Sequence, residues 1–340
     1  MAILQLSPSA KDYIWGGSRL VHEYGKTAST ASGRIAETWE LSCHPDGHCY
    51  VCAGGEGVNK EHQAPTLSEY IATHGKAILG SNCLHFQDFP VLIKLIDAQD
   101  NLSIQVHPDN AYALEHEKQF GKTEMWYVVD ALEGSFLYYG FKRPVTPEEF
   151  AKSIEDGTLL DLLNKVPVKK GDLFFIDAGT VHAIGKGILI AEIQQNSNVT
   201  YRIYDYKRKD AQGNERALHV KQALAVTNFG PAKTHDFKHH LGLCPYFCVD
   251  KLTLDGSIAK SVELYADHTS FVSILVLSGQ GIISDGQTSF AYRAGESYFV
   301  PAATGAFTIS GEVEALITTI PNMPAELNLL QLPSEQSSVA

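Results

Sequence analysis

The sequence lacks an excess of basic residues. Its 340 residues contain 27 lysines and arginines against 39 aspartates and glutamates, which gives a formal net charge of −12 at pH 7. Proteins that bind nucleic acids usually carry a basic face that contacts the phosphates, so we predict no nucleic-acid partner. The composition still permits a local basic pocket for a small anionic molecule.

The sequence also lacks a hydrophobic run of about 18 residues, the length that a transmembrane helix needs. The N-terminal segment MAILQLSPSAKDYIWGG contains neither a basic n-region nor a sustained apolar stretch, so it does not resemble a secretory signal peptide. We therefore predict a cytoplasmic protein without a membrane partner.

Cysteine pairs with metal-ligand spacing are few. Among the six cysteines, only Cys49 with Cys52 and Cys244 with Cys248 resemble zinc or redox pairs in their spacing. The first pair lies in the strand-like run CYVC, without turn glycines between its members. Because a structural zinc site needs four well-placed ligands, we expect buried free thiols in a reducing compartment instead.

Apolar patterning predicts a mainly β protein with a few helices. A chain of 340 residues suggests about two domains, and short apolar runs broken by glycine and polar clusters predict strands. Thr146 as N-cap and Pro147 at the first helical position mark one helix, which Gly157 divides. Helical patterns occupy about 67–80, 146–164 and 218–229.

Two segments share one pattern. The segment from Gly171 to His182 contains a turn, a short apolar strand and a second turn, and residues 295–305 repeat this order without the histidine. An internal repeat of this kind predicts two related β-barrels, of which one carries the functional site.

The stretch from Asn101 to Tyr127 contains three candidate metal ligands. Gln105 and His107 are two residues apart in a strand-like run, so their side chains point to the same face. A hairpin return would bring Glu124 to meet them, and the three side chains would then form a shell for a divalent metal. Alternatively, His107 is a partly buried histidine before a proline, and Glu124 is a solvated loop residue.

These segments resemble those of a known family. The segment from Gly171 to His182 resembles the second signature of the cupin barrel, and Gln105, His107 and Glu124 fit the first, with glutamine replacing the usual first histidine. Within the cupins, QVHPD, GKTEMWY and GTVHA look like the zinc-dependent type I mannose-6-phosphate isomerase family, in its shorter bacterial form. Further matches in family order are YIWGG, ETWE and YRIYDY, and the resemblance covers about residues 10–320.

The resemblance implies a fold and a division of the chain. The implied fold is mainly β, with two cupin-like (jelly-roll) β-barrels and a few helices packed between and around them. We expect a catalytic cupin domain over residues 1–230, a degenerate cupin-like β domain over 231–325 and a flexible tail over 326–340.

The resemblance also implies an activity and a cofactor. The activity is the interconversion of D-mannose 6-phosphate and D-fructose 6-phosphate, in which a proton moves between two carbons through an enediol. The implied cofactor is Zn²⁺ held by Gln105, His107, Glu124 and His182. One carboxylate among neutral donors leaves the metal net positive and Lewis acidic. The expected partner is a sugar phosphate, and the expected assembly is a monomer or a small homo-oligomer.

Three charged residues are candidates for catalysis. Arg202 lies where the family has its essential arginine and would stabilise charge on the enediol; alternatively, it is a surface arginine. Lys122 would share a face with Glu124 in an extended segment and act as a proton shuttle or substrate contact. Glu192 lies in the apolar run ILIAEIQQ, where burial would raise its pKa and suit it to act as a base. Alternatively, Glu192 pairs with Arg202.

Three further residues match the family's phosphate contacts. Ser103 shares the strand face of the ligands, and Arg208 follows the arginine segment. Lys94 is the lone charge in FPVLIKLID, and it would otherwise be expected to extend its ammonium group to the surface. A phosphate group needs such donors. Ile184 stands where the eukaryotic enzymes have a tyrosine, so we expect substrate contacts to differ there.

Two other functions compete with the isomerase. A metal-dependent cupin dioxygenase would present two or three histidines to a redox-active metal, which fits a glutamine ligand and nearby cations poorly. A non-catalytic sugar-binding cupin would have lost some of its site residues, whereas every ligand position here is occupied by a competent side chain.

Overall fold

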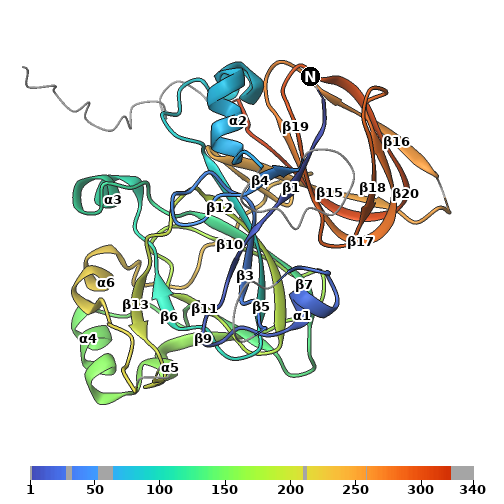
Figure 1. Cartoon of the computed structure of the whole chain (residues 1–340). Coiled ribbons are helices and arrows are strands. Elements are labelled where there is room, and N and C mark those ends of the chain that lie inside the picture. Colours follow the sequence, from blue (N-terminus) through green and yellow to red (C-terminus); the bar gives the residue numbers. More distant parts are fainter. Residues whose placement is uncertain (1, 28–32, 53–63, 210–212, 258, 323–340) are drawn as a thin grey trace, which may run out of the picture.

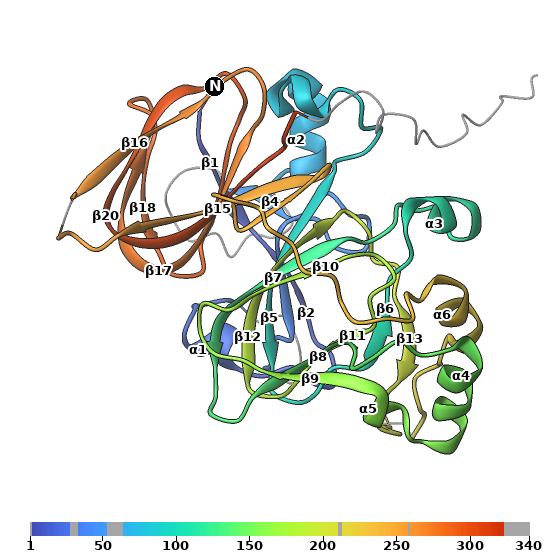
Figure 2. The ribbon, with the colours of Figure 1, turned by 180° about the vertical axis from the view of Figure 1, so that it is seen from behind.

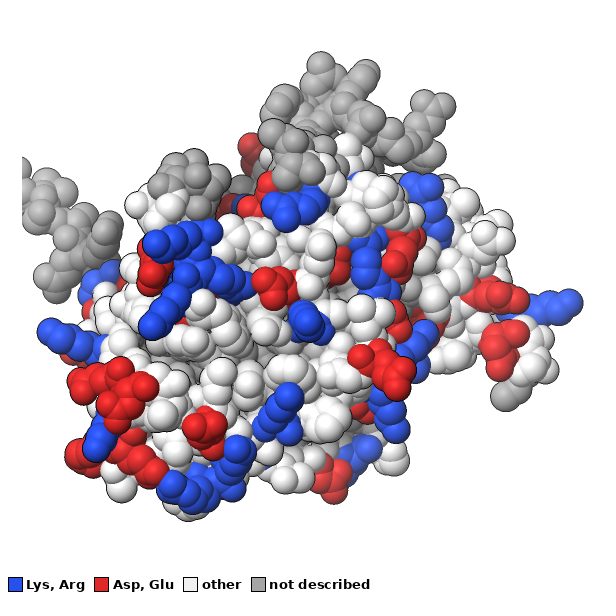
Figure 3. Space-filling view, turned by 90° about the horizontal axis from the view of Figure 1, so that it is seen from below, with Lys and Arg blue, Asp and Glu red and all other residues white. Residues whose placement is uncertain are grey.

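The structure, a computed structural model, describes residues 2–27, 33–52, 64–209, 213–257 and 259–322. The tail predicted over 326–340 lies outside these residues. Within them, no helix combines the length and the apolarity that crossing a membrane requires. The chain forms two lobes (Figures 1 and 2), and acidic and basic side chains are intermixed on the face seen in Figure 3.

Strands dominate the chain, as predicted. In order they are β1 (Leu4–Ser7), β2 (Ser9–Lys11), β3 (Glu37–Leu41), β4 (Tyr50–Cys52), β5 (Val91–Ala98), β6 (Ile104–Val106), β7 (Glu124–Ala131), β8 (Phe136–Phe141), β9 (Leu163–Pro167), β10 (Leu173–Ile176), β11 (His182–Ile184), β12 (Ile188–Gln195), β13 (Tyr201–Tyr204), β14 (Gly242–Cys244), β15 (Phe247–Leu254), β16 (Ser261–Ala266), β17 (Val272–Ser284), β18 (Ser289–Arg293), β19 (Ser297–Val300) and β20 (Gly305–Thr319).

The helices are short and lie outside the sheets. They are α1 (Arg19–His22), α2 (Leu67–His74), η1 (Lys76–Leu79), η2 (Ser81–Cys83), α3 (Asn110–His116), α4 (Pro147–Asp156), α5 (Leu159–Leu162) and α6 (Val220–Val226). Gly157 follows α4 with φ +74° and separates α4 from α5. A glycine is favoured here because it adopts this left-handed conformation without strain. Helix α3 was not predicted, although Asp109 caps its first turn through the amide of Tyr112.

The lower lobe in Figure 1 is a sandwich of two antiparallel sheets. The six-stranded sheet has the order β10-β7-β12-β5-β3-β2, and the five-stranded sheet has the order β13-β6-β11-β8-β9. Trp126 and Ile190 of the first sheet share one buried cluster with Leu137 and Ile184 of the second. The two sheets therefore pack face to face, as a jelly roll requires.

The upper lobe is a single nine-stranded sheet that folds over itself. Strand β17 pairs with β19 through Val272–Leu275 and with β18 through Gln280–Ser284. The register of β17 shifts between Val276 and Ser278. An irregularity of this kind bends a strand, so the two halves of β17 can pair with different strands. The inward side chains of these strands form their own core, so the mainly β fold of two jelly-roll lobes is confirmed.

The two lobes share strands and a core. β1 and β4, from the N-terminal part of the chain, pair in the upper sheet with β19. One buried cluster contains Val91 and Met125 of the lower lobe together with Phe247 and Phe299 of the upper lobe. The division of the chain at residue 230 stays a prediction, and any such boundary would leave β1 and β4 in the sheet of the other domain.

Candidate active site

The predicted metal ligands come from both sheets of the lower lobe. Gln105 of β6 and His182 of β11 are register partners in the five-stranded sheet. Glu124 begins β7 in the six-stranded sheet. The expected hairpin between β6 and β7 is therefore wrong, because α3 lies between them and the chain crosses to the opposite sheet. Glu124 reaches the other ligands across the sandwich.

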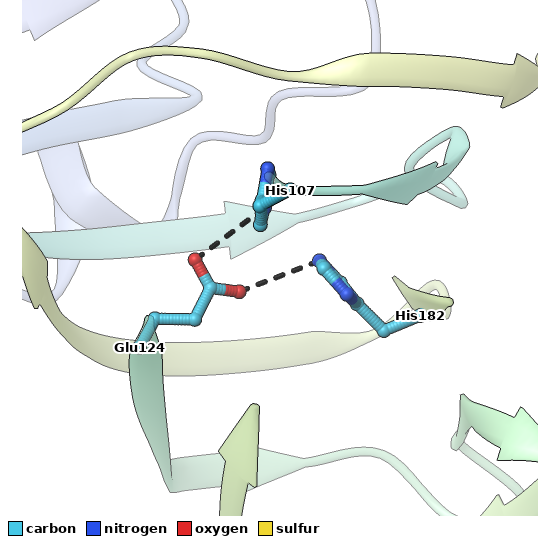
Figure 4. Close-up of side chains that lie close together, drawn as sticks. All are labelled: His107, Glu124 and His182. Atoms are coloured by element: carbon cyan, nitrogen blue, oxygen red, sulfur yellow. Dashed lines mark ion pairs between the residues drawn. The ribbon is translucent and has the colours of Figure 1, made fainter. Parts of the chain in front are cut away.

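His107, Glu124 and His182 point toward one another (Figure 4). Oε2 of Glu124 lies 3.5 Å from Nε2 of His107, and Oε1 lies 3.4 Å from Nε2 of His182. The three side chains are at most 1% exposed. Donors bound to one tetrahedral zinc ion stand roughly 3.4 Å apart, so the observed spacing suits a shared metal ion.

Backbone carbonyls fix the orientation of both imidazole rings. Nδ1 of His107 lies 2.9 Å from the carbonyl oxygen of Val199, and Nδ1 of His182 lies 2.8 Å from that of Thr180. Because a carbonyl oxygen only accepts, each Nδ1 carries a hydrogen and each Nε2 presents its lone pair to Glu124. Burial also lowers the pKa of His182 to about 4 and that of His107 well below its usual value. Neutral, oriented rings of this kind are competent metal ligands.

The buried carboxylate of Glu124 has the ammonium group of Lys122 beside it. Among the described residues, neither of its oxygens accepts a hydrogen bond of favourable angle, although Nζ of Lys122 lies 2.7 Å from Oε2. Burial and the neighbouring Glu192 raise the pKa of Glu124 to about 7, against the opposing effect of the ammonium group of Lys122. A buried carboxylate in this state favours a nearby cation, so the donor set fits a divalent metal such as zinc.

Gln105 completes the predicted set of ligands. Its Nε2 lies 3.4 Å from Nε2 of His182, so the amide donates to the ring nitrogen. A half-turn of the amide would direct its oxygen to the same place. The structure therefore brings together Gln105, His107, Glu124 and His182.

A chain of buried charges extends from the ligands. Nζ of Lys122 lies 2.7 Å from Glu124 and 3.7 Å from Glu192. Nζ of Lys94 lies 3.1 Å from Glu192 and 3.6 Å from Glu37. Lys94 and Glu192 are register partners on β5 and β12. Lysines and carboxylates thus alternate, which compensates each charge in a region with little access to water.

The prediction that the pKa of Glu192 is raised is wrong, because the pKa is lowered. Burial alone would raise it, but the ammonium groups of Lys122 and Lys94 outweigh burial and lower the pKa to about 2. Nε1 of Trp126 also donates to this carboxylate at 2.9 Å. Among the described residues, the ion pairs of Glu192 are with the two lysines, so the alternative pairing with Arg202 is wrong as well. Sequence patterning predicted burial but not these partners.

A cavity of about 260 Å³ opens onto these groups. Six of the predicted site residues line it, namely Lys94, Ser103, Gln105, Lys122, Glu192 and Arg202. Cations, neutral donors and the carboxylates of Glu37 and Glu192 thus surround a space for a small polar molecule, and Gln105 is the metal ligand that adjoins it.

Arg202 lies beside the ligands on the five-stranded sheet. It is the register partner of Gln105, and its Nη1 donates to the carbonyl oxygen of Ala217 at 2.9 Å. Its buried Nε has no hydrogen-bond partner among the described residues. Burial and the nearby Arg216 lower the pKa of Arg202, but a guanidinium stays charged in proteins. Arg202 therefore presents a positive charge with unused hydrogen-bonding capacity.

Arg208 is not among the residues that line the cavity. Its guanidinium pairs with the carboxylate of Asp205 and donates to the carbonyl oxygen of Asn101. Arg216 shares the same carboxylate, with Nε 2.7 Å from Oδ2 of Asp205, and Arg216 does line the cavity. Arg216, and not the predicted phosphate contact Arg208, therefore lines the cavity.

Several cavity residues were missed from the sequence. They are Tyr13, Trp15, Glu37, Asn198, Thr200 and Arg216. The motifs YIWGG and ETWE contain three of them and were available as family matches. Arg216 lies in a segment without apolar periodicity, so the sequence contained no signal for its position.

Comparisons with known proteins agree with this geometry. A family model described as the catalytic domain of type I phosphomannose isomerase matches residues 3–131. A second model, described as the cupin domain of mannose-6-phosphate isomerase, matches residues 237–320. The mannose-6-phosphate isomerase of Streptococcus mutans is 40% identical over 312 residues, which cover 89% of this chain and 93% of that protein.

Solved structures show the same architecture. The crystal structure of mannose 6-phosphate isomerase from Bacillus subtilis matches with a TM-score of 0.82 and 31% identity, over 94% of this chain and 99% of that chain. A mannose 6-phosphate isomerase bound with zinc and yttrium matches with a TM-score of 0.73 and 17% identity, over 94% and 99% of the two chains. The second likeness extends to the fold alone.

Proposed function

Because the chain belongs to the type I mannose-6-phosphate isomerase family, it is an aldose–ketose isomerase that interconverts mannose 6-phosphate and fructose 6-phosphate, and we propose how its residues support this reaction. The observation that carries the proposal is the convergence of two neutral histidines and a buried carboxylate beside a cavity lined by cations. Family membership favours this function over a dioxygenase or a sugar-binding cupin.

Zinc is the proposed cofactor, held by Gln105, His107, Glu124 and His182. The oriented Nε2 atoms and the buried carboxylate that faces them support this assignment, and a fold relative was solved with zinc. When bound, zinc would polarise the sugar oxygens as a Lewis acid. The donor atoms of these four residues would then set the position of the reacting end of the sugar.

Arg202 is the proposed cation for the enediol. Its guanidinium lies beside Gln105 in register and lines the cavity with an unused Nε donor. Charge that develops on the enediol oxygens is stabilised best by a donor that is already in place. Ala217 holds one Nη1 hydrogen of Arg202, which limits how far the guanidinium can turn.

Lys122 is the proposed group for proton transfer. Its Nζ bridges the metal ligand Glu124 and the carboxylate Glu192, so it lies between the metal ligands and the cavity. We propose that Nζ, as the free amine left when the ammonium group releases a proton to solvent, takes the proton from one sugar carbon and returns it to the neighbouring carbon. Glu192, with its lowered pKa, would be a weak base and is proposed to position the ammonium group of Lys122.

Phosphate binding is proposed for the other end of the cavity. Ser103 and Lys94 line it and keep their predicted roles as candidates. Lys94 is already paired with two carboxylates, and Arg208, which shares Asp205 with Arg216, does not line the cavity. Arg216, which lines the cavity, is therefore the stronger arginine candidate for the phosphate.

Location and assembly are also proposals. Six cysteines without disulfide bonds support a reducing compartment such as the cytoplasm. The proposed assembly is a monomer or a small homo-oligomer, with neither nucleic acid nor membrane as a partner.

A direct assay tests the proposed substrate. Purified protein is incubated with mannose 6-phosphate, and fructose 6-phosphate is measured through a coupled enzyme. Unphosphorylated mannose is the matched control, and we expect its turnover to be far slower because the phosphate contacts would be lost. Failure to convert mannose 6-phosphate, or equal turnover of both sugars, would contradict the proposal.

A further inference from the structure

A second group of metal-ligating side chains lies outside the active site, where the upper sheet begins. His240 precedes β14, and Cys248 and Asp250 are two residues apart on β15, so both point to the same face of that strand. Their ligand atoms all lie within 4.8 Å of one another. Of the two cysteine pairs noted in the sequence, Cys248 is the member that has such neighbours among the described residues.

Both neighbours of His240 contact the same ring nitrogen. Oδ1 of Asp250 lies 2.8 Å from Nδ1 of His240, and Sγ of Cys248 lies 3.2 Å from it. In a nucleophile–base–acid relay, the nucleophile and the acid contact opposite nitrogens of the ring. Here sulfur and oxygen meet at the same ring nitrogen, so the three donor atoms are close enough together to share one metal ion.

The burial of these side chains suits a site that is anchored on one side and open on the other. Cys248 is 7% exposed, whereas the side chains of His240 and Asp250 are 39% and 46% exposed. Sulfur and nitrogen donors of a tetrahedral zinc site stand roughly 3.6 Å apart. The observed sulfur–nitrogen contact is a few tenths of an ångström shorter, so a small outward movement of the half-exposed imidazole would admit an ion.

We propose that Cys248, His240 and Asp250 form a second metal site for a borderline divalent ion such as zinc, separate from the active site. Thiolate, imidazole and carboxylate are the donors that zinc accepts, and water would fill the fourth position from the open side. The thiol of Cys248 releases its proton to solvent when the metal binds. No redox change is involved.

The site would fasten the connection between the lobes. Residues 231–241 run from the end of the lower lobe to β14 (Figure 2). Within this connection, His235 pairs with Asp177 at 2.8 Å, and Phe237 packs on Phe175 of β10. A metal ion on His240 would tie the end of the same connection to β15. We therefore expect metal binding here to stabilise the lobe junction rather than to change the chemistry.

Cobalt distinguishes this site from the active site. The active-site donors are nitrogen and oxygen only, so a thiolate-to-cobalt charge-transfer band in the near ultraviolet can come only from a cysteine ligand. Metal-stripped protein is titrated with Co²⁺ under anaerobic conditions. We expect the band in the wild type and in His182→Ala, and its loss in Cys248→Ser. Cys244→Ser is the matched control and should retain the band.

Two surface variants cover the possibility that Cys248→Ser does not fold. Asp250→Asn and His240→Gln alter half-exposed side chains and should each weaken cobalt binding at this site by at least about tenfold. No charge-transfer band in the wild type, a band that survives Cys248→Ser, or unchanged cobalt affinity in both surface variants would overturn the inference. None of these outcomes depends on activity, so they are independent of the proposed active-site zinc.

Discussion

Gln105 and Arg202 are register partners on the neighbouring strands β6 and β13. Side chains directly opposite each other in an antiparallel pair share one face, roughly 5 Å apart. The candidate metal ligand and the candidate catalytic cation are therefore placed side by side by backbone pairing alone. On its other side Gln105 pairs with His182, so three adjacent strands each contribute one functional side chain.

Arg202→Ala should separate catalysis from metal binding. Removal of a preorganised donor for a developing oxyanion costs about 10²–10³-fold in kcat, and we expect a loss of that size with metal content unchanged. Steady-state kinetics and elemental analysis of the purified variant measure both quantities. Arg143→Ala is the control, since Arg143 is exposed and pairs with Glu149 on α4. Normal turnover in Arg202→Ala would remove this residue from the mechanism.

His182→Ala should have the opposite signature. His182 is fully buried, and its Nε2 faces Glu124 at 3.4 Å, so its loss should abolish metal retention together with activity. The strand pairing of β11 should persist, because its backbone bonds do not need the imidazole. Elemental analysis and circular dichroism test this expectation, with the exposed His116→Ala as control. Metal retained at wild-type levels would show that His182 is not a ligand.

Lys94→Met tests whether Lys94 is primarily structural. It would remove the ammonium partner of Glu37 and leave Glu192 with the more distant Lys122 alone, and breaking a buried pair costs about 3–5 kcal/mol. We expect that loss in urea unfolding, with partial recovery in Lys94→Met/Glu192→Gln, where fewer charges are left unpaired. A variant of wild-type stability with a strongly raised KM would instead favour the phosphate role.

Glu314 links the lobes in a pH-dependent way. Its Oε1 accepts a hydrogen bond from the hydroxyl of Tyr127 at 2.6 Å and pairs with Lys251 at 2.9 Å. Burial alone would raise the pKa of Glu314, but these partners lower it from 4.5 to about 2. A lowered folded-state pKa stabilises the protein above the unfolded-state pKa, and this stabilisation is lost as the pH falls toward the folded-state pKa.

Thermal melts therefore provide the measurement for Glu314. Glu314→Gln should lower the melting temperature near neutral pH, and the difference from wild type should shrink as the pH falls below about 4.5. Glu312→Gln, an exposed position two residues away on the same strand, is the matched control. A difference between Glu314→Gln and wild type that stays constant down to acidic pH would contradict the assignment.

The sequence predicted the candidate metal ligands of the site. It did not predict the strand arrangement that brings them together. Alternation on one strand and a histidine after a glycine turn are local patterns, so Gln105, His107 and His182 were recognisable. Glu124 was recognisable too, but the path of the chain that brings it to the other ligands was not. Alternation predicts which face of a strand a side chain occupies, and it does not predict the sheet to which the strand belongs. Helix α3, with Asp109 as its cap, carries the chain between the sheets.

The buried charges were the least predictable part of the site. Lys94 and Glu192 become partners through the register of β5 and β12, which depends on residues nearly a hundred positions apart. Without that register, burial alone indicated a raised pKa for Glu192, the opposite of what the two lysines produce. Arg216 likewise reaches the cavity through a loop that no periodic pattern describes.

Metal dependence of the isomerase reaction tests the central claim most directly. The protein is stripped with a chelator, dialysed and assayed with mannose 6-phosphate before and after zinc is added back. We predict that activity falls with metal content and returns with zinc, because Glu124 and the two oriented histidines present their donor atoms to one another at 3.4–3.5 Å, a spacing that suits a shared metal ion. Full activity after exhaustive metal removal would contradict the account.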